Sequence, residues 1–363
     1  MAKVLVGMSG GVDSSVSAYL LQQQGYEVSG ATLKLFDNED IGIEDKEKTC
    51  CSLSDVQDAR SVASRLGCRH YVFNYGEWFL EDVVGKFAKS YEEGRTPNPC
   101  IDCNRYIKFS RMLERAMFLE FDYIATGHYA QIVKDEKSGR YLLKKGADST
   151  KDQSYVLYTL TQDELSKTLF PLGGMNKTEI REIAEREGFV NAKKKDSQDI
   201  CFVKDGDYAA FLQNVMGVKS KPGDFIDKSG NKIGRHQGII HYTVGQRKGL
   251  GQTFGKPVYV LSKDKESNSV MLGSNEELFA DGMIVEDINL IAIEEIKNPL
   301  RVMVKARYSM KEVGAVIYPT ENGRVKVEFE EKQRAITPGQ AAVFYDGDLV
   351  VGGGTIVKAI YNK

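Results

Sequence analysis

The sequence of 363 residues lacks any run of 18 or more apolar residues, which excludes a helix that spans a bilayer. It also lacks the apolar stretch and cleavage site of a secretory signal, because residues 1–7 lead directly into an expected buried strand. Neither charge sign is in excess, since 49 Lys and Arg stand against 51 Asp and Glu. That balance neither predicts nor excludes a nucleic-acid partner, because phosphate contacts need only a local basic face. We therefore expect a cytoplasmic monomer with no membrane partner.

The six cysteines do not indicate a disulfide framework, because the cytosol keeps thiols reduced. They stand at positions 50, 51, 68, 100, 103 and 201. Cys68 follows an expected helix and is interpreted as a small buried hydrophobe. Cys100 and Cys103 have the spacing of half a zinc site, but a second pair is lacking, because Cys50 and Cys51 are adjacent. A thioredoxin-like redox pair is the other alternative.

The pattern along the chain predicts an α/β protein of two or three domains. Apolar runs alternate with helix-period segments over the first two hundred residues, which is typical of a doubly wound parallel sheet. The expected strands are 3–8, 26–35, 70–75 and 123–126, and the expected helices are 14–24, 53–66, 77–91 and 106–118. Beyond residue 220, turn pairs separate short strands. We predict a catalytic domain at 1–205, a small β-rich central domain at 206–275, and an antiparallel β-barrel at 276–363.

The loop after the first strand has the features of a phosphate site. It reads Ser9-Gly10-Gly11-Val12-Asp13-Ser14-Ser15 and leads into a helix. Glycines let the backbone approach phosphate oxygens, helix N–H groups bind anions, and the serine hydroxyls add donors. Asp13 is expected to hold a Mg²⁺ that bridges phosphates. The loop fits neither the kinase-type P-loop nor the dinucleotide fingerprint. The alternative is a tight turn with Asp13 as the helix N-cap.

Two cysteines are candidates for the reacting nucleophile. Cys103 lies just before a helix expected to start near Tyr106, with Arg105 and Lys108 nearby, so we expect its pKa to be lowered. Cys201 lies between two apolar residues, and core packing is its alternative interpretation. It follows three lysines, 193–195, that are either a solvated run of charge or a phosphate contact. Only folding can bring the two cysteines together.

Taken together and in order, these segments resemble the bacterial tRNA-specific 2-thiouridylases, members of the PP-loop ATP pyrophosphatases. The resemblance covers essentially the whole chain and implies an adenine nucleotide alpha-hydrolase-like fold. It rests on the ATP loop at 7–14, on Asn98-Pro99-x-x-x-Cys103-Asn104, and on residues 196–202 around Cys201. Further matches are Thr126-Gly127-His128-Tyr129, Lys151-Asp152-Gln153-Ser154, Tyr242-Thr243-Val244-Gly245-Gln246-Arg247 and Arg307-Tyr308.

The resemblance implies ATP-dependent 2-thiolation of the wobble uridine, U34, in tRNAs for lysine, glutamate and glutamine. The flipped uridine attacks the α-phosphate of ATP through its O2, and pyrophosphate leaves. Cys201 carries a persulfide received from a sulfur-relay protein or a cysteine desulfurase. The sulfur reaches C2 directly, or after Cys103 releases it as hydrosulfide. AMP then departs, and a Cys103–Cys201 disulfide remains to be reduced.

The resemblance also assigns residues to each ligand. The catalytic residues are Cys103, Cys201 and Asp13. ATP would contact Gly7, Met8, Ser9, Gly10, Gly11, Val12, Asp13, Ser14, Leu33 and Gly127. The target base would contact Asn98, Pro99 and Cys100. The rest of the tRNA would contact His128, Lys151, Asp152, Gln153, Arg307, Tyr308 and Gln340. Arg307 and Tyr308 are alternatively ordinary barrel surface, and residues 151–153 a helix start capped by Asp152.

One position departs from the family pattern. Residue 100 is Cys, whereas many members have Asp after Asn-Pro. Cys100, Cys103 and Cys201 could together hold three irons of a 4Fe–4S cluster and leave one iron open for hydrosulfide. A cluster in place of a persulfide is therefore a hypothesis for this chain. Other functions to separate from thiolation are an ATP-dependent ligase or amidotransferase, and a non-catalytic RNA-binding protein with a relic nucleotide fold.

Overall fold

The computed structural model describes residues 1–37, 53–194, 200–203 and 206–362. Within it the chain forms two compact units. Unit 1 comprises Met1–Val83, Cys100–Gly206 and Asp348–Val350, and unit 2 comprises Val84–Pro99, Asp207–Gly347 and Val351–Lys363. In the described part of the chain, no helix is both long and apolar enough to cross a membrane.

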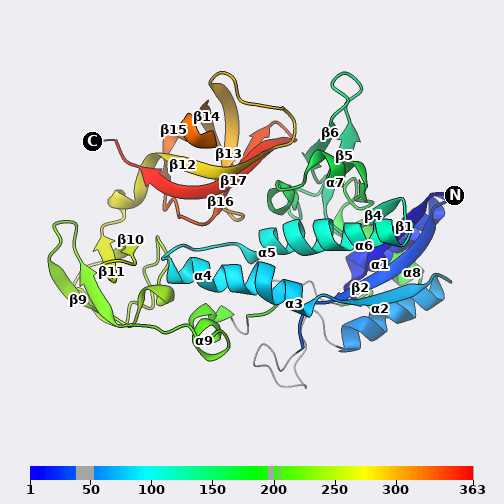
Figure 1. Ribbon diagram of the computed structural model, residues 1–363, viewed down its shortest axis with the longest axis horizontal. Helices are drawn as coiled ribbons and strands as arrows, with labels where there is room; N and C mark the ends of the chain where they lie inside the picture. The colour runs from blue at the N-terminus through cyan, green and yellow to red at the C-terminus, as the bar shows by residue number, and fades with distance from the viewer. Residues whose placement is uncertain (38–52, 195–199, 204–205, 363) are drawn as a thin grey trace. The chain divides into compact units, whose positions relative to one another are not determined.

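Unit 1 is built on the predicted parallel sheet (Figure 1). Its strand order is β3-β2-β1-β4-β7, and each neighbouring pair is parallel. The strands are β1 (Lys3–Gly7), β2 (Glu27–Lys34), β3 (His70–Asn74), β4 (Tyr123–Ala125) and β7 (Thr168–Leu169). The central strand β1 is apolar at Val4, Leu5 and Val6, which are fully buried, as expected for a strand covered on both faces. The predicted fold class of this unit is confirmed.

Three helices pack on this sheet through a common apolar core. They are α1 (Val12–Gln23), α2 (Leu53–Arg65) and α8 (Lys177–Arg186). Their core residues include Val16, Val62 and Ile180. Helix α8 starts with a capping box, in which the Asn176 side chain accepts the Glu179 N–H and the Glu179 carboxylate accepts the Asn176 N–H. Unit 1 also contains β5 (Ala130–Lys134), β6 (Tyr141–Lys145), η4 (Ser154–Leu157) and α7 (Gln162–Ser166).

The helix that carries Cys103 begins earlier than predicted. It runs from α5 (Pro99–Asp102) through the π-helical segment η3 (Cys103–Arg111) to α6 (Met112–Phe118). The expected start near Tyr106 was wrong. Proline is well suited to the first position of a helix, because its missing N–H is not needed there. The expected helix 77–91 likewise comprises α3 (Gly76–Phe79), η2 (Leu80–Gly85) and α4 (Lys86–Glu92).

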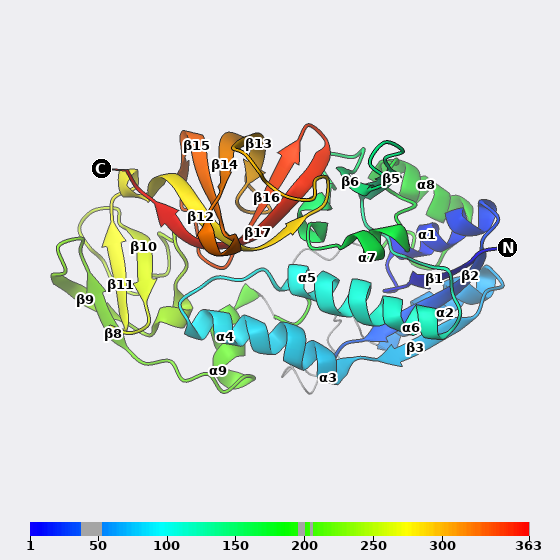
Figure 2. The same ribbon diagram turned by 45° about the horizontal axis from the view of Figure 1, so that its top comes forward.

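Unit 2 contains a small sheet and a closed barrel. The sheet has the order β10-β11-β8-β9. The barrel has the order β12-β15-β14-β13-β16-β17, and antiparallel pairing of β12 with β17 closes it (Figure 2). Its interior is filled by side chains such as Met283, Val304, Ile317 and Phe344. The bounds are α9 (Tyr208–Asn214), β8 (Gly223–Ile226), β9 (Lys232–His236), η6 (Ile239–His241), β10 (Tyr259–Asp264), β11 (Ser269–Gly273), η7 (Glu276–Leu278), β12 (Phe279–Leu290), β13 (Leu300–Lys305), β14 (Val313–Pro319), η8 (Glu321–Gly323), β15 (Val325–Arg334), β16 (Ala341–Asp346) and β17 (Leu349–Ile360).

Candidate functional site

The predicted ATP loop connects β1 to α1 in a conformation that requires glycine. Gly10 has φ +74°, and a Cβ on it would lie 2.5 Å from the backbone oxygen of Asp55. A larger residue would be both strained and in collision with α2. Gly11 is the N-cap of α1, and none of the described side chains caps the helix there. The helix therefore begins as an anion site does, with its first N–H groups not capped by a side chain.

The hydroxyls of Ser14, Ser15 and Ser17 have backbone partners. Ser14 and Ser15 each donate to the carbonyl oxygen of Gly11 at 3.0 Å, and Ser17 donates to that of Asp13 at 2.9 Å. These hydroxyls therefore have partners within the helix, and their contact with phosphate stays a prediction. The alternative that Asp13 caps the helix is also wrong, since Asp13 is the second residue of α1.

Asp13 lies in a network that joins three segments of unit 1. Its two carboxylate oxygens accept hydrogen bonds from Lys177 Nζ at 2.7 and 2.8 Å. Tyr129 donates its hydroxyl to Oδ1 at 2.7 Å. Lys177 is the first residue of α8, and its side chain is 12 % exposed, so this ion pair is shielded from solvent. The contact between Asp13 and Lys177 had no signal in the sequence, because nothing in spacing or composition links residues so far apart.

Gly127 lies directly against the loop. A Cβ at this position would lie 2.9 Å from Asp13 C and Cβ and from Ser14 N. Glycine is thus the residue that lets β4 and the following turn approach the start of α1 this closely. The structure therefore brings together two sequence motifs, the loop and Thr126-Gly127-His128-Tyr129. Leu33 lies on β2, whose neighbour in the sheet is β1, and is half-buried.

A second network holds the loop from the segment that precedes Cys201. The carbonyl oxygen of Gly10 accepts hydrogen bonds from Asn191 Nδ2 at 2.9 Å and from Lys194 Nζ at 3.1 Å. Lys194 also binds Asp55 at 2.5 Å and Asp58 at 2.7 Å. The interpretation of 193–195 as a solvated run of charge was therefore wrong for Lys194, which is a tertiary tether. Lys193 is exposed, and Lys195 lies outside the described residues, as does most of the matched segment 196–202.

Cys103 is buried, and this reverses the predicted direction of its pKa. It is the first residue of η3, one turn inside the helix. Burial raises the pKa of the thiol above its ordinary value, an effect that the nearby Lys108 partly offsets. The expectation of a lowered pKa was wrong, because it placed the thiol at a helix N-terminus, whereas the helix starts four residues earlier. A neutral, buried thiol is less reactive until a base or a bound substrate changes its surroundings.

The other cysteines differ from Cys103 in exposure. Cys100 is exposed and Cys201 is half-buried beside Phe202, whose ring lies 5.6 Å from that of Phe79. Among the described residues, Cys68, Cys100, Cys103 and Cys201 are thiols rather than disulfides. Cys68 packs against the sheet core, as expected for a small hydrophobe, but it is half-buried rather than buried. Cys50 and Cys51 lie outside the described residues.

Alkylation by iodoacetamide is expected to modify Cys100 before Cys103. Cys100 is exposed, whereas Cys103 is buried and its raised pKa leaves less thiolate at pH 7. Below that pKa, the rate at Cys103 should rise about tenfold for each pH unit, because the thiolate is the nucleophile. Peptide mass spectrometry of time courses at pH 7, 8 and 9 measures both rates. Equal rates at the two sites at pH 7 would contradict this picture.

The tRNA-contact residues predicted in unit 1 are largely engaged within the fold. His128 is buried, its Nδ1 lies 2.7 Å from Thr126 Oγ1, and burial holds its pKa well below the ordinary value. Its ring packs against Phe109 and Phe170. A neutral buried imidazole is placed for packing rather than for phosphate contact, so its contact with tRNA stays a prediction without support from this structure.

The segment 151–153 has a similar internal role. Gln153 Oε1 accepts the Tyr129 N–H at 2.9 Å, which ties this segment to the turn beside the ATP loop. Asp152 accepts the backbone N–H groups of Gly146 and Ser154 at 3.0 and 3.1 Å. The N-cap of η4 is Gln153, so Asp152 was not the helix cap that the alternative required. Lys151 is half-buried in the preceding turn.

In unit 2, the predicted tRNA-contact residues differ in exposure. Tyr308 is 44 % exposed, with the Lys305 ammonium 5.3 Å from its ring centroid. Arg307 is half-buried, and its Nη2 donates to the Val244 carbonyl and to Thr337 Oγ1. The contacts of both residues with tRNA stay predictions.

The remaining predicted residues of unit 2 are Asn98, Pro99 and Gln340. Asn98 and Pro99 shortly precede Cys103 in the sequence, and Gln340 contacts the same segment of the chain at Thr96. Gln340 donates from Nε2 to the Thr96 carbonyl at 2.8 Å. Asn98 is half-buried and Pro99 is buried.

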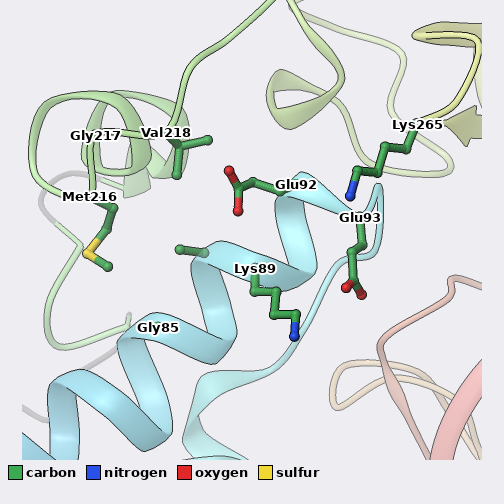
Figure 3. A pocket seen from close by; sticks show the side chains of 9 residues that line it. Gly85, Lys89, Glu92, Glu93, Met216, Gly217, Val218 and Lys265 are labelled. Atoms are coloured by element: carbon green, nitrogen blue, oxygen red, sulfur yellow. The ribbon is translucent and has the colours of Figure 1, made fainter.

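Unit 2 also contains an open groove of about 460 Å³ between α4 and residues 216–218 (Figure 3). Lys89, Glu92 and Glu93 line one side, and Lys265 contributes a second ammonium group. Two lysines and two glutamates line it, so its lining has no excess of either charge sign. None of the described site residues lines this groove.

Family models match the chain in three consecutive segments. A model described as a tRNA methyl transferase HUP domain matches residues 2–205. A tRNA methyl transferase PRC-barrel domain matches residues 209–274, and an aminomethyltransferase beta-barrel domain matches residues 280–356.

Individual proteins of high similarity span the full chain. The tRNA-specific 2-thiouridylase MnmA 1 of Thermoanaerobacter sp. (strain X514) is 53% identical over 358 residues, covering 99% of this chain and 98% of its own length. The tRNA-specific 2-thiouridylase MnmA of Clostridioides difficile (strain 630) is 51% identical and covers 99% of both chains. Among solved structures, the U34-tRNA thiolase NcsA from Methanococcus maripaludis with its 4Fe–4S cluster is 18% identical, covers 60% of this chain and 64% of its own, and has a TM-score of 0.32. That value is too low to carry an argument about the site.

Proposed function

Because the chain belongs to the tRNA-specific 2-thiouridylase family, we propose that this tRNA sulfurtransferase uses ATP to adenylate U34 and replaces its O2 by sulfur. The observation that carries the ATP part is the loop at 7–15, which has a glycine N-cap and lies against Gly127. Adenylation is required because a carbonyl oxygen is a poor leaving group, whereas AMP is a good one. The proposed substrates are tRNAs for lysine, glutamate and glutamine.

ATP would lie with its phosphates at the N-terminus of α1, where N–H groups and the glycines face it. The Lys177 ammonium, held by Asp13, places positive charge beside the loop. Mg²⁺ in nucleotide sites takes most of its ligands from phosphates and water, so one carboxylate is sufficient on the protein side. Asp13 is therefore proposed as the carboxylate that meets Mg²⁺-ATP, once Lys177 moves from it to a phosphate. When bound, the ion neutralises phosphate charge.

Sulfur transfer is proposed to run through Cys201 and Cys103. The terminal sulfur of a Cys201 persulfide attacks C2 of the adenylated uridine, and the C2–O bond breaks with release of AMP. The Cys103 thiolate then attacks the inner sulfur, the S–S bond to the product breaks, and a Cys103–Cys201 disulfide remains. A cellular thiol reductant supplies the two electrons that return both cysteines to thiols. Burial of Cys103 suits this step, because exclusion of water protects an adenylate from hydrolysis.

A 4Fe–4S cluster on Cys100, Cys103 and Cys201 is the alternative to the persulfide route. Among the described residues, no group of three or more His, Cys, Asp or Glu side chains is placed to hold a metal ion. The persulfide route needs only two cysteines and is therefore the route proposed. The sulfur donor is proposed to be a sulfur-relay protein or a cysteine desulfurase, and the enzyme is proposed to act as a cytoplasmic monomer.

Mass spectrometry of tRNA nucleosides tests the function directly. A strain that lacks this protein is expected to lose 2-thiouridine at position 34 of the three tRNAs, and the intact gene is expected to restore it. Normal 2-thiouridine in the deletion strain would refute the proposal. The purified protein should also release pyrophosphate from ATP only when tRNA is added. An ATP-dependent ligase would instead require ammonia, and a non-catalytic RNA-binding protein would release no pyrophosphate.

A further inference from the structure

We propose that the turn Pro338-Gly339-Gln340 of the barrel positions the segment that leads into the Cys103 helix, so that Gln340 is a positioning residue for sulfur transfer. The inference rests on the proposed role of Cys103. Both partners lie in unit 2, since residues 95–99 and 338–340 belong to it. Thr96 precedes Pro99, the first residue of α5, by three positions, so a fixed Thr96 limits where this helix can begin.

Two hydrogen bonds join the turn to the backbone of Thr96. The Thr96 N–H donates to the Pro338 carbonyl at 2.9 Å. The Thr96 carbonyl accepts from Gln340 Nε2 at 2.8 Å. The turn thus binds both polar groups of one residue, as a neighbouring β-strand would. Its own geometry is set by the barrel, because Gly339 N donates to the Ile356 carbonyl and Ile356 N donates to the Gln340 carbonyl.

Gly339 allows this close approach. Its φ is +90°, and a Cβ on it would lie 2.9 Å from Arg95 Cβ and from Thr96 N, and 3.2 Å from Thr96 C. Those atoms belong to the backbone or to the stem of a side chain, which cannot move aside cheaply. Glycine is therefore required here for the contact itself as well as for the conformation.

Further contacts hold the same segment from two other elements of unit 2. Lys263, on β10, donates from Nζ to the Arg95 carbonyl at 3.5 Å and to the Tyr242 carbonyl at 2.8 Å. The Arg95 guanidinium lies 3.8 Å from Glu286, on β12. Thr96 Oγ1 is buried and has no hydrogen-bond partner among the described residues, which costs free energy. The backbone contacts thus hold the segment in a position that leaves the Thr96 hydroxyl without a hydrogen bond to the described residues.

The positioning role accounts for Gln340 differently from a tRNA contact. A residue that binds tRNA lowers the KM for tRNA, whereas a residue that positions the Cys103 helix changes the rate of sulfur transfer after the adenylate has formed. The amide of Gln340 is already engaged in the protein by the Thr96 carbonyl. The two roles therefore predict different kinetic outcomes for the same substitution.

Limited trypsin digestion tests the contact without any enzyme assay, because the Arg95–Thr96 bond is itself a tryptic site. In Gly339→Ala, cleavage after Arg95 is expected to be about tenfold faster than in the unsubstituted protein, since both hydrogen bonds are strained. Gln340→Glu keeps the size but removes the donor, so about a fivefold increase is expected; Gln340→Lys restores a donor and should reverse most of it. Gly323→Ala is the matched control, because Gly323 also has positive φ (+69°) but no atom of the described chain lies within 4 Å of its Cβ position. Unchanged cleavage in Gly339→Ala and Gln340→Glu would overturn the contact.

Single-turnover kinetics then tests the consequence. Gln340→Glu is expected to lower the rate of thiolation at least tenfold, with pyrophosphate release and the KM for tRNA unchanged within twofold. A raised KM for tRNA with unchanged trypsin cleavage would overturn the positioning role and return Gln340 to tRNA binding. Failure of the proposed function gives a different pattern. Trypsin then still cleaves faster after Arg95 in Gly339→Ala and Gln340→Glu, but neither the variants nor the unsubstituted protein makes 2-thiouridine.

Discussion

Replacing Cys103 by serine is expected to lower tRNA thiolation by more than about a thousandfold, while tRNA-dependent release of pyrophosphate continues. Serine has nearly the same size, and Cys103 is buried at the start of η3, so the fold should tolerate the change. The hydroxyl cannot cleave the persulfide S–S bond, because it is a far weaker nucleophile toward sulfur than a thiolate. One reaction mixture gives both readouts: 2-thiouridine by mass spectrometry and pyrophosphate by enzymatic detection.

Cys201→Ser should show the same separation of adenylation from thiolation, because it removes the sulfur carrier. Cys68→Ser is the control: this thiol is half-buried against the sheet core and donates to the Ala63 carbonyl at 3.5 Å, a bond that serine also makes. Thiolation in the control should stay within a few-fold of the unsubstituted rate. If either Cys103→Ser or Cys201→Ser still thiolates tRNA, the proposed transfer of sulfur through the Cys201 persulfide and the Cys103 thiolate is excluded. Iron bound to the unsubstituted protein, together with loss of activity in Cys100→Ser, would instead support the cluster hypothesis.

Lys177→Ala is expected to lower the rate of adenylation by about a hundredfold, the size of effect found when one preorganised donor to a developing charge is lost. The substitution removes the cation that binds both oxygens of Asp13. It leaves a carboxylate, held by Tyr129, facing the place where anionic phosphates would lie. Repulsion between like charges then weakens ATP binding as well as pyrophosphate release. The rate of pyrophosphate formation with saturating tRNA measures the effect.

A double-mutant cycle makes the Lys177 result specific. If the two side chains act through their ion pair, Asp13→Asn and Lys177→Ala together should cost less than the sum of the single changes. Lys167→Ala is the matched control, because Lys167 forms a similar ion pair with Asp163 at 3.2 Å on an exposed helix. Surface pairs of that kind contribute little, so its rate should be unchanged. Full activity in Lys177→Ala would remove Lys177 from the ATP site.

The classes of the parallel sheet and of the barrel could be predicted because each depends on local patterns. The run Val4-Leu5-Val6 is apolar at successive positions, as a strand covered on both faces must be, and it lies at the centre of the parallel sheet. The capping box at Asn176 and Glu179 uses residues three positions apart, so the start of α8 could be identified from the sequence. The closed barrel followed from alternating polarity between turn pairs.

One error concerns a local feature, the start of a helix, and the others concern burial and partners that come from residues far apart in the chain. The start of the Cys103 helix was placed too late, near Tyr106, because the preference of proline for the first helical position was not applied to Pro99. The direction of the Cys103 pKa then followed the wrong helix position and ignored burial. For Lys194 the sequence left a solvated charge and a phosphate contact open, whereas Asp55 and Asp58 from α2 bind it. Sequence spacing contains no information about such partners.

By itself, the sequence identified the loop that we propose to bind ATP, the two candidate cysteines and the family, because each motif depends on residue types at short, fixed spacings. Only the tertiary structure decided what surrounds them. It paired Asp13 with Lys177, buried Cys103, and placed Gln340 against the backbone of Thr96. The physical reason is that charge, solvation and close approach depend on three-dimensional neighbours, and those neighbours come from segments that folding brings together.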